Sequence, residues 1–344
     1  MKNTTFILIG YGNMGKDWGR IITRIRNVQV IGIVDVLEHN RIQAQKDFPL
    51  TKEQTSDNLE KLITFVKPDA IIDCSPPFAH YKNTLIALKN GCHILGEKPI
   101  SLNLSEAQEV INLSLHKKKI YMINQNYRRN PLVNIIQKTV GQIGKIYSIN
   151  IDYFQGLEFK DTFRYSFDHP LLLDMAIHHF DLVRMITLQN AKSVYAKEYN
   201  PETSKFKNGS GAFAQFEMNN GAIFSYRGSW TSKGHNTSFN GFWRIIGELG
   251  TLIWDGNLTV SIEKQVKDSR LHKRTLKIPQ KYTLTPYEVF LYELEENLRL
   301  FISSIEQNTF PDCWCGDNVN SLQMVLSAIE SSEKGNVVPM KDIH

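Results

Sequence analysis

Short apolar runs alternate with amphipathic stretches along the first third of the chain. The intervening stretches repeat apolar residues at helical spacing, as in 105–115, for which Ser101 and Ser105 are candidate N-caps. Strands that alternate with helices predict βαβ units and a doubly wound parallel sheet, the Rossmann architecture of the α/β class. The runs with the composition of buried strands are 6–9, 28–34, 70–73, 93–95 and 120–123.

The pattern changes from about residue 124. A helix-like stretch at 169–188 lies among segments in which apolar and polar residues alternate, and helices at 287–306 and 317–332 close the chain. Such segments, separated by Asn-Gly and Asp-Gly turns at 208–209, 220–221 and 255–256, predict a large, open, mostly antiparallel sheet. We therefore expect a Rossmann domain at 1–123 and an α+β domain at 124–344. The alternating segments are 146–154, 193–198, 212–217, 223–229, 242–246 and 251–254.

Composition narrows the classes of protein that this chain can belong to. Its 344 residues suffice for about two domains, and 42 % hydrophobic residues are typical of a folded protein. The net charge is only +5 with scattered basic residues, so we expect no nucleic-acid partner, and no apolar run is long enough for a membrane span. Cys74, Cys92, Cys313 and Cys315 lack zinc spacing, which predicts free thiols in the cytoplasm.

A glycine-rich turn follows the first predicted strand and opens the first predicted helix. It reads Gly10-Tyr11-Gly12-Asn13-Met14-Gly15, and Asp35 follows Gly15 by 20 residues, at the end of the second run. Gly10 allows the tight turn, Gly12 lets a pyrophosphate approach the backbone, and Gly15 lets the helix pack on the strand. We expect all six residues and Asp35 to bind a dinucleotide.

Asp35 also indicates which dinucleotide binds. A carboxylate at this position accepts hydrogen bonds from the ribose hydroxyls and repels a 2′-phosphate. Residues 36–38 contain no Arg or Lys, although Arg41 is near enough to reach back. We therefore expect NAD, with NADP less favoured.

Two further motifs extend the pattern. Cys74-Ser75-Pro76-Pro77-Phe78-Ala79-His80 follows the third run, and Gly96-Glu97-Lys98-Pro99 follows the fourth. Together with the glycine turn they resemble the glucose-fructose oxidoreductase/inositol dehydrogenase/MocA family. Asp174-Met175-Ala176-Ile177-His178 resembles the D-x-G-x-H segment of that family, with Ala176 in place of the usual glycine. The resemblance spans nearly the whole chain.

The resemblance implies where the nicotinamide half of the cofactor lies. Ser75 and Pro76, with Cys74 and His80 of the same motif, line it, and Lys98 sits between nicotinamide and substrate. Glu97 has a supporting role there. Asn126 is a candidate for the nicotinamide carboxamide, and Trp18 has either a core role or one along the cofactor.

The candidate catalytic residues are Lys98, Asp174 and His178. Asp174 and His178 are four residues apart, so on an α-helix they share a face, and the carboxylate would orient the imidazole for proton transfer. His179 falls on the apolar stripe and is expected in the core, while Asp181 is expected to brace the helix. A metal held by Asp174, His178 and Asp181 is the weaker reading, because Lys98 would oppose a divalent cation, and we expect no metal.

The candidate substrate-binding residues are Tyr127, Arg164 and Trp230, in addition to Lys98, Asp174 and His178. Aromatic faces and guanidinium donors suit the hydroxyls of sugars and polyols, although packing is an equally good reading of each. Residues 166–170 depart from the Gly-rich segment that is common in the family. The shape of the substrate pocket is therefore not predicted.

The expected activity is an NAD-dependent dehydrogenase that oxidises a hydroxyl of a sugar, inositol or related polyol. Two alternatives stay open: a redox-neutral NAD-dependent glycosidase or lyase of the same family, and a non-catalytic sugar or dinucleotide sensor. The family also implies a homodimer or homotetramer, in which the open sheet face packs on another subunit.

Overall fold

The computed structural model describes residues 3–156, 158–159, 163–265, 270–277 and 285–343. The chain forms two compact units, each built from two segments. Unit 1 comprises Met1–Arg129 and Thr285–Val319, and unit 2 comprises Asn130–Leu284 and Asn320–His344. The two-domain division expected at residue 123 is continuous in sequence, whereas in the structure a C-terminal segment returns to unit 1.

Unit 1 is built on a six-stranded parallel sheet of the order β3-β2-β1-β4-β5-β6, which confirms the doubly wound architecture. The order reverses between β1 and β4, so the loops after these two strands lie at the switch point where such sheets bind ligands. The two-residue β3 is too short to leave a hydrophobic run and was not predicted. The strands are β1 (Thr4–Ile9), β2 (Val28–Val34), β3 (Thr55–Ser56), β4 (Ala70–Asp73), β5 (His93–Gly96) and β6 (Tyr121–Ile123).

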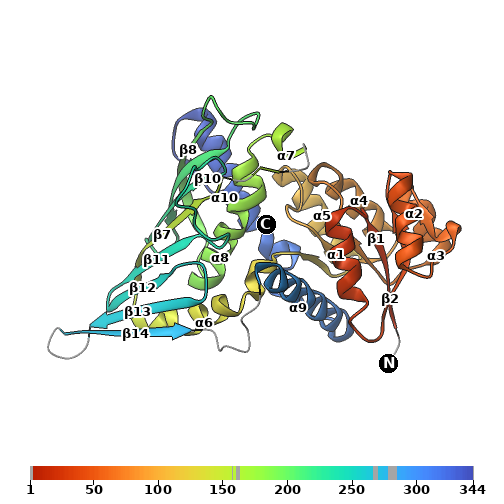
Figure 1. Cartoon of the computed structure of the whole chain (residues 1–344), viewed down its shortest axis with the longest axis horizontal. Helices are drawn as coiled ribbons and strands as arrows, with labels where there is room; N and C mark the ends of the chain where they lie inside the picture. The colour runs from red at the N-terminus through yellow and green to blue at the C-terminus, as the bar shows by residue number, and fades with distance from the viewer. Residues whose placement is uncertain (1–2, 157, 160–162, 266–269, 278–284, 344) are drawn as a thin grey trace. The chain divides into compact units, whose positions relative to one another are not determined.

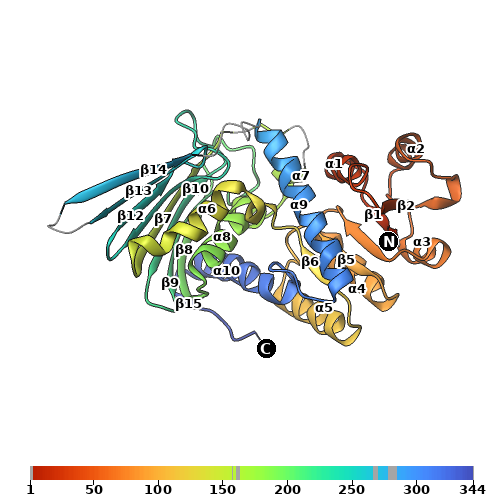
Figure 2. The same cartoon turned by 90° about the horizontal axis from the view of Figure 1, so that it is seen from below.

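Helices cover both faces of this sheet, with α1 and α2 on one face and α3, α4 and α5 on the other (Figure 2). The helix expected at 105–115 is α5, but neither Ser101 nor Ser105 caps it. The carboxamide of Asn103 does, accepting a hydrogen bond from the backbone N–H of Glu106. The helices are α1 (Asn13–Ile22), α2 (Glu38–Asp47), α3 (Leu59–Val66), α4 (Pro77–Lys89) and α5 (Leu104–His116), with short 3-10 turns η1 (Lys52–Gln54) and η2 (Asn126–Arg129).

Helix α9 (Pro286–Gln307) belongs to unit 1, although more than 150 residues separate it from β6. Its Leu294, Leu298 and Phe301 are fully buried in the same hydrophobic cluster as Phe6 and Trp18. The ring centroids of Phe6 and Phe301 are 6.3 Å apart. This packing is why the core of unit 1 needs a C-terminal segment.

Unit 2 contains a nine-stranded sheet of the order β14-β13-β12-β11-β7-β10-β9-β8-β15. Only the β7–β10 pair is parallel among the strand pairs described, which confirms a mostly antiparallel sheet. Strands β13 to β15 were not predicted. The strands are β7 (Ile146–Phe154), β8 (Ala191–Tyr199), β9 (Gly211–Met218), β10 (Ile223–Ser229), β11 (Phe242–Gly247), β12 (Gly250–Trp254), β13 (Thr259–Gln265), β14 (Leu271–Lys277) and β15 (Val338–Pro339).

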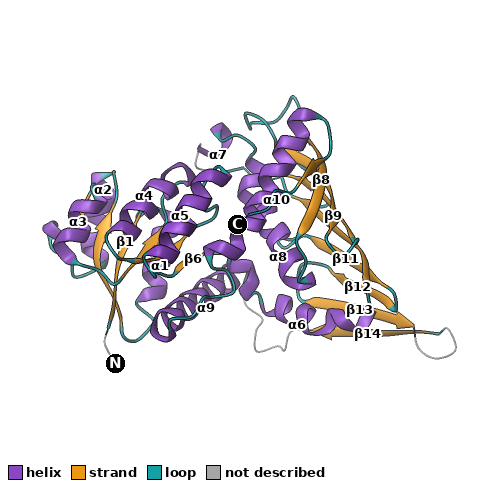
Figure 3. Cartoon of the chain, turned by 180° about the vertical axis from the view of Figure 1, so that it is seen from behind, coloured by secondary structure: helices purple, strands orange, loops and turns teal. Residues whose placement is uncertain are grey.

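Helices α6, α8 and α10 lie on one face of the nine-stranded sheet (Figures 1 and 3). The stretch expected as a single helix at 169–188 is instead a π-helix, η4 (Leu171–Ala176), followed by α8 (Ile177–Thr187). None of the described helices combines the length and apolar character needed to cross a bilayer. The remaining elements are α6 (Pro131–Thr139), η3 (Val140–Ile143), α7 (Phe163–Ser166) and α10 (Cys315–Lys334).

Candidate active site

The glycine turn between β1 and α1 leaves room for a ligand where a phosphate would lie. Gly10 has a positive φ of 82°, and a Cβ on it would lie 2.9 Å from the carbonyl oxygen of Cys74. A Cβ on Gly15 would lie 2.0 Å from the carbonyl oxygen of Gly10, so both positions need glycine for packing. A Cβ on Gly12 would meet nothing within 4 Å. Of the three glycines in this turn, only Gly12 has open space on its side, and it is the one expected to face a pyrophosphate.

Helix α1 begins directly at this opening. Its N-cap is Gly12, which has no side chain to satisfy the N–H groups of the first turn, and the first turn contains no acidic residue. Free N–H groups and the positive end of the helix dipole favour an anion. The residues present therefore fit the pyrophosphate of a dinucleotide.

Asp35 is buried at the end of β2 and is held by three donors. Its carboxylate accepts hydrogen bonds from the backbone N–H groups of Tyr11 (2.7 Å) and Leu37 (2.8 Å) and from Nδ2 of Asn40 (2.9 Å). Nη1 of Arg41 donates to the main-chain carbonyl of Asp35 at 2.7 Å. The carboxylate is thus fixed in place, and the guanidinium lies beside its main chain.

Tyr11, expected at the cofactor, turns its side chain into the core. Its hydroxyl donates to Asp47 at 2.8 Å, and its ring packs edge-on against Phe48. Burial is the largest cause that raises the pKa of this phenol far above its ordinary value, followed by the hydrogen bond to Asp47. Because its side chain is turned into the core, Tyr11 would meet a cofactor only through its main chain.

The two motif loops after β4 and β5 are neighbours in unit 1. Asp73 pairs with Gly96 at the ends of these strands, and the N–H of Glu97 donates to the carbonyl of Asp73 at 2.9 Å. Asp73 also accepts from the N–H of Ser75 at 2.9 Å, and Asn83 on α4 donates to the hydroxyl of Ser75 at 3.0 Å. The Ser75-Pro76 turn and the Glu97-Lys98 loop therefore leave the sheet side by side.

Glu97 is buried rather than solvated, and its carboxylate is the centre of a polar network. Oε1 accepts from the indole Nε1 of Trp18 at 3.0 Å and from Nδ2 of Asn124 at 2.8 Å. Asn297 on α9 donates in turn to Asn124 at 2.7 Å. Burial raises the pKa of Glu97, against the lowering effect of Trp18, Lys98 and Asn124. The fully buried Trp18 has a core position, and its N–H supports Glu97.

His80 on α4 contacts both motif loops. Its Nε2 lies 2.8 Å from the carbonyl oxygen of Ser75, and its Nδ1 lies 2.7 Å from the carbonyl oxygen of Pro99. The imidazole is 2 % exposed. The buried imidazole of His80 therefore contacts main-chain groups of both motif loops.

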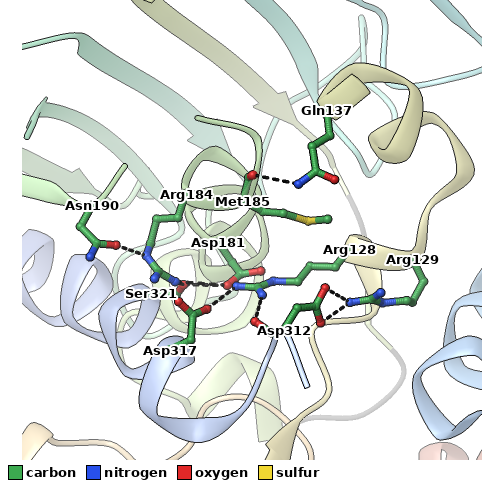
Figure 4. A network of polar contacts seen from close by, with 10 residues as sticks. All are labelled: Arg128, Arg129, Gln137, Asp181, Arg184, Met185, Asn190, Asp312, Asp317 and Ser321. Carbon is green, nitrogen blue, oxygen red and sulfur yellow. Dashed lines mark hydrogen bonds and ion pairs between the residues drawn. The ribbon is translucent and has the colours of Figure 1, made fainter. Parts of the chain in front are cut away.

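Asn126 and Tyr127 lie in the 3-10 turn η2 that follows β6. Nδ2 of the buried Asn126 donates to Oε2 of Glu293 on α9 at 2.7 Å, which leaves the amide oxygen to accept from a carboxamide. Tyr127 is half-buried. The turn continues into Arg128, whose guanidinium is paired with Asp317 at 2.9 Å, as Figure 4 shows.

In unit 2 the π-helix carries Asp174, and α8 carries His178. The junction between the two lies within the Asp174–His178 interval, so this segment is not the regular α-helix that the prediction assumed. Asp174 accepts from Nε of Arg164 at 3.0 Å, and both side chains are partly exposed. The expected substrate residue Arg164 is thus a partner of the expected catalytic carboxylate.

His179 is a core residue, as its place on the apolar stripe predicted. It is fully buried, its Nε2 lies 3.2 Å from the carbonyl of Phe239, and burial lowers its pKa to about 4. Asp181 braces the helix: the hydroxyl of Ser321 donates to it at 2.7 Å, and Arg184 lies 3.8 Å away (Figure 4). Its charge is balanced by protein groups.

Trp230 packs among other aromatic rings. Its ring is 4 % exposed and meets those of Tyr153 and Phe159 edge-on, with centroids 5.3 and 5.2 Å apart. The guanidinium of Arg164 lies over the Phe159 ring at 5.0 Å. Trp230 thus offers little surface to a ligand, and Phe159, which the sequence reasoning missed, links it to Arg164.

The sequence reasoning also missed the residues that hold the site in place. Asn40, Asn124, Glu293 and Asn297 each bond to a predicted site residue or to its partner. Asn124 lay in a stretch already singled out, between the fifth predicted strand and Asn126. The two α9 residues are some 170 positions from their partners, and no local pattern indicates them.

Two family models match the chain, one for each predicted half. Residues 4–125 match the GFO/IDH/MocA model described as an oxidoreductase family with an NAD-binding Rossmann fold. Residues 138–253 match the GFO/IDH/MocA C-terminal domain. Together the two matches span more than half of the chain.

Individual relatives agree with this assignment. The chain is 21 % identical to 1,5-anhydro-D-fructose reductase of Ensifer adhaerens over 97 % of its own length and 98 % of the relative. It is 26 % identical to myo-inositol 2-dehydrogenase of Thermotoga maritima over 55 % of this chain and 56 % of the relative. The structure of levoglucosan dehydrogenase in complex with NADH superposes with a TM-score of 0.85 at 18 % identity, covering 99 % and 100 % of the two chains.

The glycine turn with its open Gly12, the buried Asp35 and both family matches lead to one conclusion. This chain belongs to the GFO/IDH/MocA family, as an NAD-binding oxidoreductase.

Proposed function

We propose that this protein is an NAD-dependent dehydrogenase that oxidises a hydroxyl of a sugar, inositol or related polyol. The observation that carries the proposal is the pairing of Asp73 with Gly96, which brings the Ser75-Pro76 turn and the Glu97-Lys98 loop out of the sheet together. A lysine beside the turn expected at nicotinamide is placed to contact a reacting hydroxyl. Bound NAD supplies the hydride acceptor.

The residues of the chain then position the substrate, stabilise the developing charge and accept the proton. In this proposal Lys98 donates a hydrogen bond to the reacting oxygen and stabilises the alkoxide that develops on it. His178 takes the hydroxyl proton, and Asp174, paired with Arg164, positions the substrate and the imidazole. Variants of Lys98 and of His178 test these two roles separately.

The substrate class is supported by the relatives. One is named for an anhydrofructose, one for inositol and one for levoglucosan, each a polyhydroxylated ring or its derivative. Arg164 and Tyr127 supply donors suited to hydroxyl groups, and Asn126 keeps an amide oxygen for the nicotinamide carboxamide. The identity of the sugar and the carbon that is oxidised are left to the assay.

The test is NADH formation at 340 nm with NAD and a panel of inositols, aldoses, anhydrosugars and sugar acids. NADP is run in parallel, and bound cofactor is measured on the purified protein. We expect NADH from one substrate class and a lower rate with NADP. If NAD is already bound and an aglycone is released without net NADH, the redox-neutral alternative replaces the proposal. If NAD binds and every sugar is inert, the sensor alternative does.

Two variants test the assigned roles. Lys98→Met and His178→Gln should each lower kcat by about 100-fold or more while NAD binding is retained, since each removes a group acting on the transition state. His179→Gln would be a poor control because His179 is buried in the core. Tyr81→Phe is the matched control: Tyr81 is half-buried on α4, its hydroxyl donates to Glu109 at 2.6 Å, and its replacement should leave kcat unchanged.

We also propose a homodimer or homotetramer in a reducing compartment such as the cytoplasm. All four cysteines are free in the structure, which suits a compartment where thiols stay reduced.

The proposed assembly would bury exposed aromatic side chains on strands of unit 2. These are Tyr147, Tyr195 and Phe213, each about half exposed. Light scattering coupled to size exclusion measures the assembly, and a monomer at micromolar concentration would contradict it.

A further inference from the structure

We propose that His80 is a positioning residue for Lys98: as a doubly protonated imidazolium it donates from both ring nitrogens and ties the Ser75 turn to the Lys98-Pro99 loop. The catalytic consequence for Lys98 rests on the proposed dehydrogenase function. The protonation state of His80 and its two hydrogen bonds do not rest on that function, and they can be measured on the protein alone.

The geometry of the two contacts carries the first step. Nε2 lies 2.8 Å from the carbonyl oxygen of Ser75, and Nδ1 lies 2.7 Å from the carbonyl oxygen of Pro99. A main-chain carbonyl can only accept a hydrogen bond. A neutral imidazole donates from one nitrogen and presents a lone pair at the other, so it would set a lone pair against a carbonyl oxygen at one of these distances. Only the imidazolium satisfies both contacts.

Burial makes the alternative costly. His80 is 2 % exposed, so a nitrogen lone pair facing a carbonyl has no water to relieve it. A buried positive charge in turn needs compensation, and Glu97 supplies it, since the carboxylate of Glu97 interacts electrostatically with both Lys98 and His80.

The consequence is that Lys98 sits between two fixed neighbours. On one side, Glu97 is held by the indole of Trp18 and the carboxamide of Asn124. On the other side, the carbonyl of Pro99 is held by His80. The same imidazole holds the carbonyl of Ser75, so the loop expected at nicotinamide and the loop that carries Lys98 cannot drift apart. Groups that act on a transition state need such fixed supports, because a displacement of about 1 Å can cost about 100-fold in rate.

The direct test uses the wild-type protein with ¹⁵N-labelled histidine. Ring-nitrogen chemical shifts separate a protonated nitrogen from one with a lone pair, and His80→Gln assigns the signals. His93 is the internal control, because its Nδ1 accepts a hydrogen bond from the N–H of Ile120 at 3.0 Å and burial lowers its pKa to about 4. At pH 7.5 we expect two protonated nitrogens in His80 and one in His93. A lone pair on either nitrogen of His80 overturns the imidazolium.

The positioning role is tested on the substrate found in the 340 nm assay. His80→Gln keeps donors without the charge, and His80→Phe keeps the ring without donors. We expect kcat to fall roughly 10- to 100-fold in His80→Phe with less than a threefold change in the KM for the sugar, a partial recovery in His80→Gln, and no change in Tyr81→Phe. A merely structural role would instead lower the melting temperature and leave kcat per folded molecule intact, which overturns the role.

The two parts fail separately. If no sugar gives NADH, the proposed function fails, but the ring-nitrogen chemical shifts still show whether His80 donates hydrogen bonds from both nitrogens. If the shifts agree with an imidazolium and His80→Phe turns over at the wild-type rate, the positioning role is wrong while the dehydrogenase stands.

Discussion

Replacing Gly12 by alanine should weaken NAD binding while leaving the fold nearly intact. Gly12 has φ −76° and ψ −154°, which alanine adopts without strain, and the added methyl would meet nothing within 4 Å. The fold loses only the preference for glycine over alanine at a helix N-cap, about 0.5–1 kcal/mol. The melting temperature should therefore fall by about 2–4 °C at most.

The cost to the cofactor is larger because the methyl occupies the opening at the start of α1. A pyrophosphate pushed outward loses at least one hydrogen bond between a backbone N–H and a charged oxygen, worth about 1.5–3 kcal/mol. This corresponds to roughly a 10- to 150-fold rise in the Kd for NAD. Isothermal titration calorimetry measures that constant, and the thermal unfolding midpoint is recorded on the same sample.

Gly15→Ala is the matched comparison. Its Cβ would lie 2.0 Å from the carbonyl oxygen of Gly10, so the backbone must move and stability should fall by about 1–3 kcal/mol or more. The two neighbouring glycines should thus separate a binding defect from a folding defect. A Gly12→Ala protein that binds NAD with the wild-type Kd would refute the assignment of the opening to the pyrophosphate.

Three further predictions concern specificity, pH and packing. Asp35→Ser should bring the rates with NADP and NAD within about tenfold of each other by removing the charge that repels a 2′-phosphate, measured as kcat/KM for both cofactors. The hydrogen bond that Nδ1 of His169 donates to the carboxylate of Glu198 at 2.6 Å is the main cause that raises the pKa of His169. The pair therefore stabilises the fold fully below the ordinary histidine value of 6.5, and this contribution disappears as pH rises through the raised pKa. His169→Gln should therefore lower the free energy of unfolding by about 1 kcal/mol at pH 6 and by less at pH 9 in urea titrations, and an equal loss at both would contradict the linkage. Phe301→Ala should cost about 3–5 kcal/mol because the ring is fully buried against Phe6, whereas the exposed Phe65→Ala should stay within about 0.5 kcal/mol in the same titrations.

The parts of the fold that carry a local signal were predictable. Glycine spacing located the nucleotide turn, because only glycine tolerates the close approach of Gly10 to Cys74 and of Gly15 to Gly10. Continuous apolar runs located most strands of the first sheet, and the alternation of apolar and polar residues located most strands of the second. The turn glycines Gly209 and Gly221 have the positive φ that their turns require.

Long-range packing left no such signal. The helix that carries Phe301 was predicted at 287–306, but Phe301 contacts Phe6 across almost 300 residues, so the place of this helix in unit 1 could not be read from a periodic pattern. Strand β14 is rich in exposed charged residues, so its sequence does not show the alternation of apolar and polar residues that indicates a strand. The π-helix at Leu171–Ala176 lengthens one turn, and sequence reasoning had assumed α-helical spacing from Asp174 to His178.

The site was predictable to the extent that its motifs are contiguous. Lys98 and Ser75 could be assigned from motifs next to strand ends. Their supports could not, since Trp18, Asn124 and Asn297 reach Glu97 or its partner from separate elements. Whether a residue lies at a surface or in a core also depends on tertiary packing, as the nearly buried Trp230 illustrates.

The most direct test of the central claim follows the hydrogen itself. The sugar or polyol identified in the panel is labelled with deuterium at the oxidised carbon, and a single turnover with enzyme in excess over NAD is analysed by mass spectrometry. The account predicts one deuterium in the reduced nicotinamide together with the matching carbonyl product, and a slower turnover than with unlabelled substrate. Deuterium released to water, or returned to the sugar without net NADH, would contradict it.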